Sequence, residues 1–399
     1  MDKKKSKPQE NRKQHKNKEK PPALSTVVTA VDPESSREAL LSALYPFGQM
    51  IEKSGVVAFP TETVYGLGAS ALDPEGIEKI FAAKGRPSDN PLIVHITKVE
   101  EVFELAREVP EKSIQLMKAF WPGPLTMIFK KRPVVPDIVT AGGDTVGIRM
   151  PDHPVAKALI EISGVPLVAP SANASGKPSP TRAHHVWQDL KGKIHGIVDG
   201  GSCAVGIEST VMDMTVEPPM LLRPGGITQA MIREVIGPVD RDEHLDEIDR
   251  GKSPEDPRDF PGKVRSPGMK YTHYAPKAKV VILRGGRREV IKKVKELQKR
   301  YQGSGQKVGI ITVDENLKEY ETPEEPRQKK SEIRTLGSEK DPGKMAANLF
   351  AILRDFDQTD VEVILAEALE DREMGYAIMN RLSKAAGQNI LYVDEEDRP

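Results

Sequence analysis

Polar side chains that could bind an anionic ligand are concentrated between residues 60 and 95. They comprise hydroxyls, a carboxylate, two cations, an amide and an imidazole: Thr61, Glu62, Thr63, Tyr65, Lys84, Arg86, Asn90 and His95. Each one alone has an ordinary structural explanation; Lys84, for example, could complement a helix dipole. Their concentration in a few expected loops is what favours a binding site for an anion.

The segments around these side chains predict strand and helix ends that meet. Residues 55–59 are a short apolar run bounded by Gly and Pro, which is typical of a buried strand ending at Pro60. Asp73-Pro74 predicts the start of a helix that ends at Lys84-Gly85, before a further strand at 92–96. Because open α/β sheets bind ligands at such strand ends, we expect a single site here.

A second polar run, residues 170–180, follows an expected strand at 166–170. It is rich in Ser and Pro and contains Ser171, Asn173 and Ser179. Successive backbone N–H groups in such a turn can form an anion-binding nest, and the hydroxyls add donors. The alternative is a surface loop whose Ser and Pro residues only shape its turns.

Several catalytic motifs are missing from the sequence. There is no Walker-type phosphate loop, no H-E-x-x-H zinc motif and no G-x-S-x-G nucleophile elbow. Gly66-x-Gly68 resembles the start of a dinucleotide fingerprint, but Ala71 occupies the third glycine position and the helix begins too late. Ser171 has no evident His and Asp partners, so a hydrolase triad is not expected. An ATP-dependent enzyme with this sequence would use neither a Walker loop nor the kinase loops.

Composition limits the class of protein. The 399 residues are enough for two domains, and the formal net charge of zero gives no global field that points to nucleic acid. The single cysteine, Cys203, rules out an intramolecular disulfide and a cysteine-based zinc site. No apolar run approaches the roughly 20 residues of a membrane span, and no signal peptide is recognisable. We therefore expect a cytoplasmic protein.

Alternating strands and helices predict an α/β fold, and uneven strand spacing leaves the strand directions open. Expected strands are 25–31, 55–59, 92–96, 125–129, 146–150, 166–170, 194–199, 209–213, 219–223, 279–283, 308–313 and 361–365. Expected helices are 35–53, 74–84, 99–108, 110–120, 154–162, 182–190 capped by Thr181, 287–301, 344–356 and 376–386. A further helix is expected to be capped by Thr228 and to end at Gly237-Pro238. The last third forms a small β-α-β array, Rossmann-like in topology but without the glycine fingerprint.

The chain divides into four expected segments. They are a basic tail at 1–22, a first domain at 23–238, a linker at 239–276 and a second domain at 277–399. The tail has almost no apolar residues and is expected to be disordered, either as a solubilising tail or as an arm that touches RNA. The linker carries Met269, Lys270, Tyr271, His273 and Tyr274. Such residues are unusual in a passive tether, so we expect residues 266–276 to close over the site as a lid.

Ordered motifs give the chain a resemblance to a known family. Lys84-x-Arg86 with Ser171-x-Asn173 resembles the K-x-R…S-x-N pattern of the YrdC/Sua-type family, the L-threonylcarbamoyladenylate synthases. Blocks at 60–67, 87–92, 145–149 and 208–210 resemble the same family in the same order. The linker and the closing Asn380-Arg-Leu382 are similar to its longer, two-domain members. The resemblance runs from about Ala23 to the C-terminus, and several blocks in order are far more specific than any one of them.

The resemblance implies a twisted mixed-sheet domain with a positively charged concave face, followed by the smaller Rossmann-like domain. It implies a nucleotidyltransferase that uses L-threonine, bicarbonate and ATP to make threonylcarbamoyl-AMP and pyrophosphate, with Mg²⁺ held mainly by the ATP phosphates and no protein metal site. The product would pass to the machinery that forms threonylcarbamoyladenosine in tRNA. Matching motifs imply these roles: Lys84 and Arg86 catalytic; Thr63, His95, Arg149 and Ser209 on threonine; Arg86, Asn90, Thr145, Ser171, Asn173, Ser179, Arg223 and Tyr274 on ATP.

The residue chemistry agrees with that reaction. Attack of an N-carboxy-threonine on the α-phosphate brings two anions together, and Lys84, Arg86, Arg149 and Arg223 can offset their repulsion. No general base is evident, so positioning and charge neutralisation would supply most of the catalysis. The main alternative is a non-catalytic RNA-binding protein that uses the basic face and the tail. A weaker alternative is a related carbamoyltransferase module, because chains with that module usually carry cysteine pairs, which are missing here.

Overall fold

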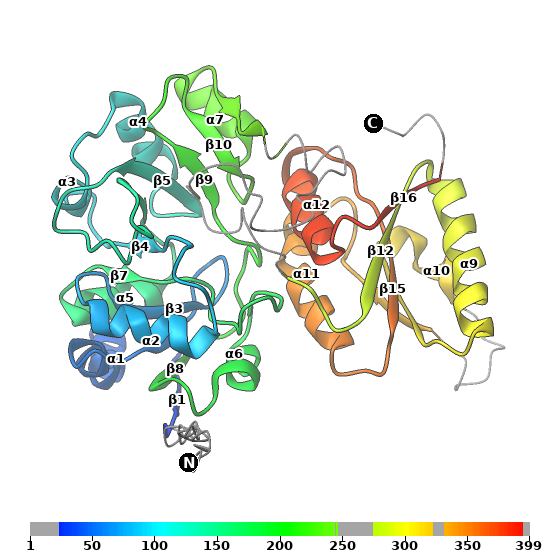
Figure 1. The fold of residues 1–399 in the computed structure, drawn as a ribbon, viewed down its shortest axis with the longest axis horizontal. Helices are drawn as coiled ribbons and strands as arrows, with labels where there is room; N and C mark the ends of the chain where they lie inside the picture. The colour runs from blue at the N-terminus through cyan, green and yellow to red at the C-terminus, as the bar shows by residue number, and fades with distance from the viewer. Residues whose placement is uncertain (1–23, 244, 246–273, 322–330, 394–399) are drawn as a thin grey trace, which may run out of the picture.

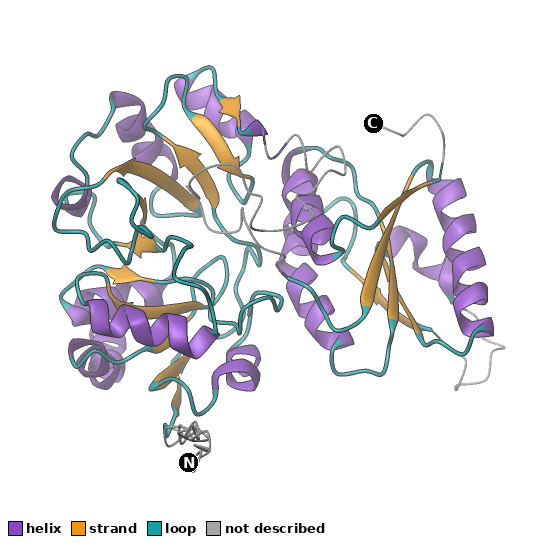
Figure 2. Cartoon of the chain, viewed as in Figure 1, coloured by secondary structure: helices purple, strands orange, loops and turns teal. Residues whose placement is uncertain are grey.

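The computed structural model describes residues 24–243, 245, 274–321 and 331–393, which form two units lying side by side (Figure 1). The first unit is built on a mixed eleven-stranded sheet and the second on an all-parallel five-stranded sheet. Figure 2 shows helices flanking both sheets. The predicted α/β class, a larger mixed sheet before a smaller α/β unit, is confirmed. Within the described residues, every helix is too short or too polar to cross a membrane.

Strands from the whole of the first unit's sequence join its sheet. In spatial order they are β1 Val27–Ala30, β8 Gly196–Asp199, β2 Val57–Phe59, β3 Gly66–Ser70, β7 Leu167–Val168, β4 Ile93–His95, β6 Thr145–Arg149, β5 Leu125–Lys130, β9 Thr210–Asp213, β10 Met220–Arg223 and β11 Asp240–Arg241. Strand β3 was not expected, because its glycines resemble a loop. Strand β11 pairs with β10, so the first unit continues beyond the expected boundary at residue 238.

The helices of the first unit begin and end largely where their caps predict. They are α1 Arg37–Glu52, α2 Pro74–Lys84, α3 Glu101–Leu105, α4 Glu111–Phe120, α5 Pro154–Ser163, α6 Ala183–Leu190 and α7 Gln229–Ile236. Asp73 caps α2, and Gly85 ends it in a left-handed conformation with φ of 62°. The prediction that Thr181 caps α6 is wrong. Arg182 is the N-cap residue without a side-chain bond, and the Thr181 N–H instead donates to His185 Nδ1.

The second unit is a doubly wound parallel sheet. Its strands in spatial order are β14 Glu332–Thr335, β13 Val308–Thr312, β15 Val363–Glu367, β12 Lys279–Arg284 and β16 Ile390–Tyr392. Its helices are α9 Arg287–Gly303, the 3₁₀ turn Asp314–Asn316, α10 Leu317–Tyr320, α11 Pro342–Phe356 and α12 Glu373–Ala385. Helix α9 covers one face, and α11 with α12 covers the face nearer the first unit (Figure 1). The two strands at the sheet edges, β14 and β16, and the short α10 were not expected from the sequence.

The two units share a hydrophobic cluster. Val64 and Ile207 of the first unit pack with buried residues of α11, α12 and the second sheet. Gly206, whose φ is 75°, lies so close to α11 that an added Cβ would be 2.2 Å from Ala347 Cα. The units are therefore in direct contact next to the loop that carries Glu208 and Ser209. The other predicted boundaries stay predictions, since the tail and residues 246–273 of the linker are outside the described residues.

Candidate functional site

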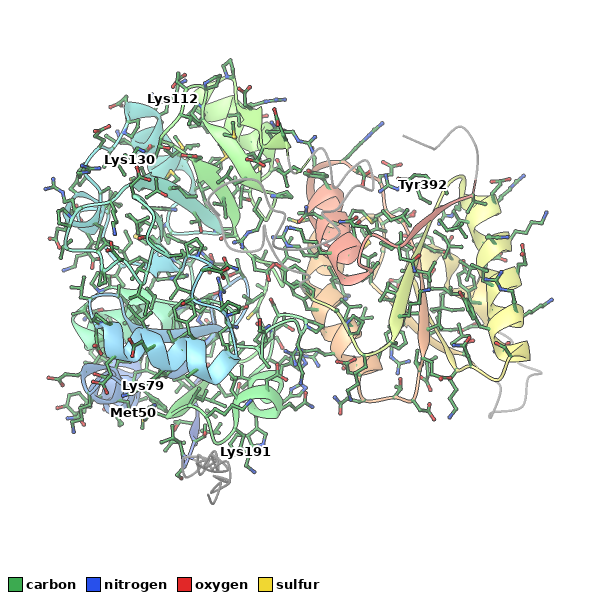
Figure 3. The ribbon with its side chains drawn as sticks, viewed as in Figure 1. Met50, Lys79, Lys112, Lys130, Lys191 and Tyr392 are labelled. Carbon is green, nitrogen blue, oxygen red and sulfur yellow. The ribbon has the colours of Figure 1, made fainter. Side chains whose placement is uncertain are left out.

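Nine of the predicted site residues line one narrow cavity of about 70 Å³. They are Thr63, Arg86, His95, Arg149, Ser171, Asn173, Ser209, Arg223 and Tyr274. They come from strand ends and loops far apart in the sequence, which meet as the strand pattern predicts. The surface lysines labelled in Figure 3 lie instead on the outside of the first unit, where Lys112 pairs with Glu217 and Lys130 with Asp144. The cations of the cavity are thus mostly guanidinium groups held inside the protein.

Arg149 is held in place from three sides at the end of β6. Its Nη1 donates to Thr63 Oγ1 at 2.9 Å, and its Nε donates to the Gly123 carbonyl at 3.3 Å. Its Nη2 lies 2.7 Å from Glu62 Oε1 in a buried ion pair. Both Glu62 carboxylate oxygens are without a hydrogen-bond partner in the described chain, so this pair is electrostatic in character. Such a fixed guanidinium suits recognition of a carboxylate.

His95 lies beside Arg149 in the parallel pairing of β4 with β6. Its Nδ1 is 3.1 Å from the Ile93 carbonyl oxygen, to which it can donate. Burial, together with the neighbouring Arg149 guanidinium, lowers the pKa of His95 to about 3. His95 is therefore neutral at physiological pH, and it offers a hydrogen-bonding group without adding charge.

Ser209 and Arg223 form a second polar group across the cavity. Arg223 donates from Nε to the Ser209 carbonyl at 3.0 Å and from Nη2 to Ser209 Oγ at 3.1 Å. Thr126 Oγ1 lies 2.8 Å from the same hydroxyl. Burial and the charge of Arg381 lower the pKa of Arg223 to about 10, so the guanidinium stays charged at neutral pH. The hydroxyl of Ser209 is thereby given a defined orientation.

Lys84 lies behind the wall of the cavity and organises the 171–173 loop. Its Nζ donates to the Ser171 carbonyl, to the Asn173 carbonyl at 2.7 Å and toward Asn173 Oδ1 at 3.5 Å. Burial and the nearby Arg86 lower the pKa of Lys84 well below its usual value. The Asn173 amide donates to the Ala174 and Lys177 carbonyls at 2.8 and 2.9 Å. The two halves of the K-x-R…S-x-N pattern are therefore in direct contact.

Arg86 and Asn90 flank the entrance of β4. Arg86 Nη2 donates to the Asn90 carbonyl at 3.2 Å and to the Pro91 carbonyl at 3.1 Å. The Asn90 side chain is 1% exposed, and its Oδ1 has no hydrogen-bond partner among the described residues. A buried polar atom in this state is one that a ligand or water commonly satisfies.

Four predicted residues do not line the cavity. Lys84 and Asn90 lie directly behind its wall, and Ser179 donates to Glu208 Oε1, which is part of the wall, at 2.5 Å. Thr145 is different, since it lies at the opposite end of β6 from Arg149 and pairs there with Lys130. The structure thus brings twelve of the predicted residues together and leaves Thr145 apart.

Tyr274 joins the cavity to the second unit. Its ring lies 4.9 Å from the ring of Phe350 in α11, and the residue is buried with φ of 68°. Burial and the charge of Glu208 raise the pKa of its phenol, so the phenol stays protonated. Residues 266–273, the rest of the expected lid, lie outside the described residues.

Sequence reasoning gave no role to three charged residues at this site: Glu208, Arg354 and Arg381. The only sequence signal for Glu208 and Arg381 is that they lie in the family-like motifs at 208–210 and 380–382. A motif match does not say which distant residue a side chain contacts, so their pairing could not be predicted. Burial alone would raise the pKa of Glu208, but Arg381 and Arg223 outweigh it and lower the pKa below its usual value.

No three His, Cys, Asp or Glu side chains of the described residues are arranged to hold a metal ion.

Two family models match the chain. One, described as telomere recombination and named for Sua5, YciO and YrdC, matches residues 49–225. The other, described as the C-terminal domain of threonylcarbamoyl-AMP synthase, matches residues 227–387. Together they cover most of both units.

Similar proteins agree with these matches. The threonylcarbamoyl-AMP synthase of Pyrococcus abyssi is 48% identical over 343 residues, which cover 86% of this chain and 94% of that protein. The enzyme of the same name from Bacillus subtilis is 47% identical over 343 residues, covering 86% and 92%. A crystal structure of P. abyssi Sua5 complexed with L-threonine matches with a TM-score of 0.81 at 45% identity, and covers 92% of this chain and 100% of that one.

Proposed function

This chain belongs to the threonylcarbamoyl-AMP synthases, in the long form with a YrdC-type and a C-terminal Sua5 domain, and we propose that the cavity around Arg149 binds its substrates. The family makes the chain a nucleotidyltransferase of tRNA threonylcarbamoyladenosine modification rather than a non-catalytic RNA-binding protein. The reaction proposed for the cavity consumes L-threonine, bicarbonate and ATP and releases pyrophosphate. The strongest support is the convergence of three guanidinium groups, those of Arg86, Arg149 and Arg223, in one small space.

L-Threonine binds at the Arg149 end of this cavity. The guanidinium, held by Thr63 and Glu62, binds the amino-acid carboxylate, and His95 and Ser209 provide neutral groups for the threonine hydroxyl. A pocket that hydrogen-bonds a hydroxyl discriminates strongly against an analogue without it, because its own polar groups would be left unpaired. The solved relative with bound L-threonine supports the choice of amino acid.

ATP binds along the Arg86 and Ser171–Asn173 side of the cavity. Arg86 and Arg223 face the phosphates, and the loop that Lys84 holds offers backbone and side-chain donors. The unpaired Asn90 Oδ1 is available to accept a hydrogen bond from the nucleotide. These cations support the positively charged face that the sequence resemblance implied. About 70 Å³ is well below the roughly 300–1,000 Å³ of ordinary ligand sites, so ATP requires a wall such as Tyr274 to move.

The ATP phosphates would hold Mg²⁺. The donor set suits this arrangement, because the two carboxylates nearest the cavity, Glu62 and Glu208, are each paired with an arginine. Phosphate oxygens are the usual ligands of Mg²⁺ in nucleotide sites. When bound, the ion would neutralise charge on the phosphates that the arginines do not reach.

The chemistry is one of positioning and charge neutralisation. A carboxylate oxygen of N-carboxy-threonine attacks the α-phosphorus of ATP, and the bond from that phosphorus to the pyrophosphate oxygen breaks. Arg86, Arg149 and Arg223 lower the repulsion between the two anions and stabilise the leaving pyrophosphate. The product then passes to the enzymes that modify tRNA; contact of this chain with RNA, through the basic tail, and a cytoplasmic location remain parts of the proposal.

The substrate assignment predicts strict coupling of ATP consumption. Purified protein with Mg²⁺ should release pyrophosphate from ATP only when L-threonine and bicarbonate are both present. Serine in place of threonine should give much lower turnover, because it lacks the methyl group of the threonine side chain. Pyrophosphate release and labelled bicarbonate incorporation into an adenylate would be measured together. Equal turnover with serine, or without any amino acid, would contradict the assignment.

Arg86→Ala tests the phosphate role. Loss of one charge-assisted contact, worth roughly 1.5–3 kcal/mol, should lower ATP affinity or kcat about tenfold or more. Arg86 is half-buried and donates to loop carbonyls, so circular dichroism must first show a folded variant. Arg288→Ala, an exposed arginine of α9, is the matched control and should leave the kinetics unchanged. Wild-type kinetics in a folded Arg86→Ala protein would refute the role.

A further inference from the structure

Arg381 belongs to α12 of the second unit, but its guanidinium group contacts the first unit. The residue is 0% exposed. Its Nε donates to Glu208 Oε2 at 3.0 Å, its Nη2 to the Glu208 carbonyl at 3.1 Å and its Nη1 to the Pro224 carbonyl at 2.6 Å. One side chain therefore joins two segments of the first unit. Each bonded residue is adjacent in sequence to a residue that lines the cavity: Glu208 precedes Ser209, and Pro224 follows Arg223.

Glu208 is a carboxylate in the wall of a cavity proposed to bind anions. Its Oε1 accepts from Ser179, and its Oε2 accepts from Arg381. The two nearby guanidiniums, of Arg381 and Arg223, lower the pKa of Glu208 by more than burial raises it, so the carboxylate is ionised. An ionised carboxylate beside a triphosphate would repel it unless a cation neutralises that charge. Arg223 of the first unit is one such cation, and the second unit provides the other, Arg381, which donates directly to Glu208 Oε2.

A second buried arginine crosses between the units in the same way. Arg354 of α11 donates from Nε and Nη2 to the Pro178 carbonyl at 3.0 and 2.6 Å, and pairs with Asp189 at 2.9 Å. Asp189 in turn accepts from the Ala174 N–H at 3.1 Å. The loop from 174 to 179, which carries Ser179, is therefore also fixed by the second unit.

We propose that Arg381 is a positioning residue of the active site: it fixes the loops that carry Ser209 and Arg223 and neutralises Glu208, so that ATP binds beside that carboxylate. The inference rests on the proposed assignment of the cavity to threonine and ATP. It gives the Sua5-type domain a direct task in the synthase reaction, which is to complete the electrostatics of a site in the neighbouring domain.

The full-length Arg381→Met variant tests the proposal. It should raise the KM for ATP about tenfold or more, because Glu208 loses the guanidinium that donates to its Oε2 and keeps only Arg223 as a nearby cation. The double variant Arg381→Met/Glu208→Gln should recover a large part of that loss, since the repelling charge is gone. A purely structural role for Arg381 predicts the opposite, because the second substitution would remove further hydrogen bonds. Steady-state kinetics with ATP and with threonine would be measured separately.

Tyr376→Phe is the matched control. Tyr376 lies on the same helix and its hydroxyl accepts a 2.5 Å hydrogen bond from Arg241 of the first unit, but it does not line the cavity. Its removal should leave both KM values unchanged. Thermal unfolding of every variant shows whether it is folded. If Arg381→Met does not fold, Arg381→Lys replaces it. The three donors of an ammonium lie on one nitrogen and do not reproduce the spacing of the three guanidinium nitrogens that bind Glu208 and both carbonyls, so a several-fold rise in KM is still expected.

Two results would overturn the inference while leaving the proposed function intact. One is an unchanged KM for ATP in folded Arg381→Met, or in Arg381→Lys. The other is a double variant that binds ATP no better than Arg381→Met alone. Failure of the proposed function would differ, because the wild-type protein itself would then release no pyrophosphate in a threonine- and bicarbonate-dependent manner.

Discussion

Replacing Arg149 with methionine is expected to lower kcat/KM for L-threonine by about 100-fold or more. Removing one partner of a buried charge contact typically costs about 2–5 kcal/mol, and every 1.4 kcal/mol is a factor of ten. Arg149 is fixed by Thr63 and Glu62, so no other cation of the described residues is positioned to replace it at that end of the cavity. Calorimetric titration with threonine would measure the loss directly.

The same substitution should also destabilise the fold, and a second variant separates the two effects. Arg149→Met leaves Glu62 as a buried charge without its partner, which costs about 3–5 kcal/mol of unfolding free energy. Adding Glu62→Gln removes that charge, so Arg149→Met/Glu62→Gln should regain most of the stability in urea denaturation. It should not regain threonine binding. Recovery of both in the double variant would mean that Arg149 has only a structural role.

Lys84→Met is the second substitution with a large expected effect. It removes the amino group that donates to the Ser171 and Asn173 carbonyls, and each buried carbonyl left unpaired costs about 1–3 kcal/mol. The 171–173 loop should lose its fixed conformation, and kcat/KM for ATP should fall on the order of 100-fold. The variant should still fold, since the hydrophobic stripe of α2 is unchanged.

Lys79→Met is the matched control for this experiment. Lys79 is on the same helix, and it donates to the Ser54 carbonyl at 3.0 Å and to Glu75 on the outside of the first unit (Figure 3). Its replacement should change ATP kinetics less than about twofold, as is usual for a surface pair worth at most about 1 kcal/mol. Equal effects of Lys84→Met and Lys79→Met would show that the K-x-R lysine does not act on the nucleotide loop.

The sequence allowed most of the fold to be predicted because its local signals are strong. Asp73, Pro74 and Gly85 define α2 by N-cap, first-turn proline and left-handed C-cap, and the structure agrees. The Gly66–Ser70 strand was not predicted, since glycine is unfavourable in strands. Glycine occurs in a strand mainly where a neighbouring group packs too close for a side chain. Gly68 is packed against Phe59 of β2, where an added Cβ would be only 2.7 Å from the ring. Tertiary packing of this kind leaves no local signal.

The sequence indicated most of the residues that form the site, but only some of the contacts between them. The expectation that strand ends meet at one site is met by His95 and Arg149, which lie opposite each other in the parallel pair β4–β6. The direction and register of that pair were not predicted from the sequence. Thr145 was assigned to ATP from a motif that spans the whole of β6, and it lies at the opposite end of that strand from Arg149, so its contact with ATP stays a prediction. Arg381 is 173 residues from Glu208, and no periodicity in one helix indicates the loop that its outer face will meet.

Because Val64 and Ile207 share one hydrophobic cluster with α11 and α12, we expect the two sheets to unfold as one cooperative unit. Domains joined by a linker are expected to move relative to each other unless their interface is large and hydrophobic. Here unfolding of either unit would expose apolar surface of both units. It would also leave one charged residue of each buried pair, Glu208–Arg381 and Asp189–Arg354, without its partner. A substrate that binds in the first unit is therefore expected to protect the second unit as well from unfolding and proteolysis.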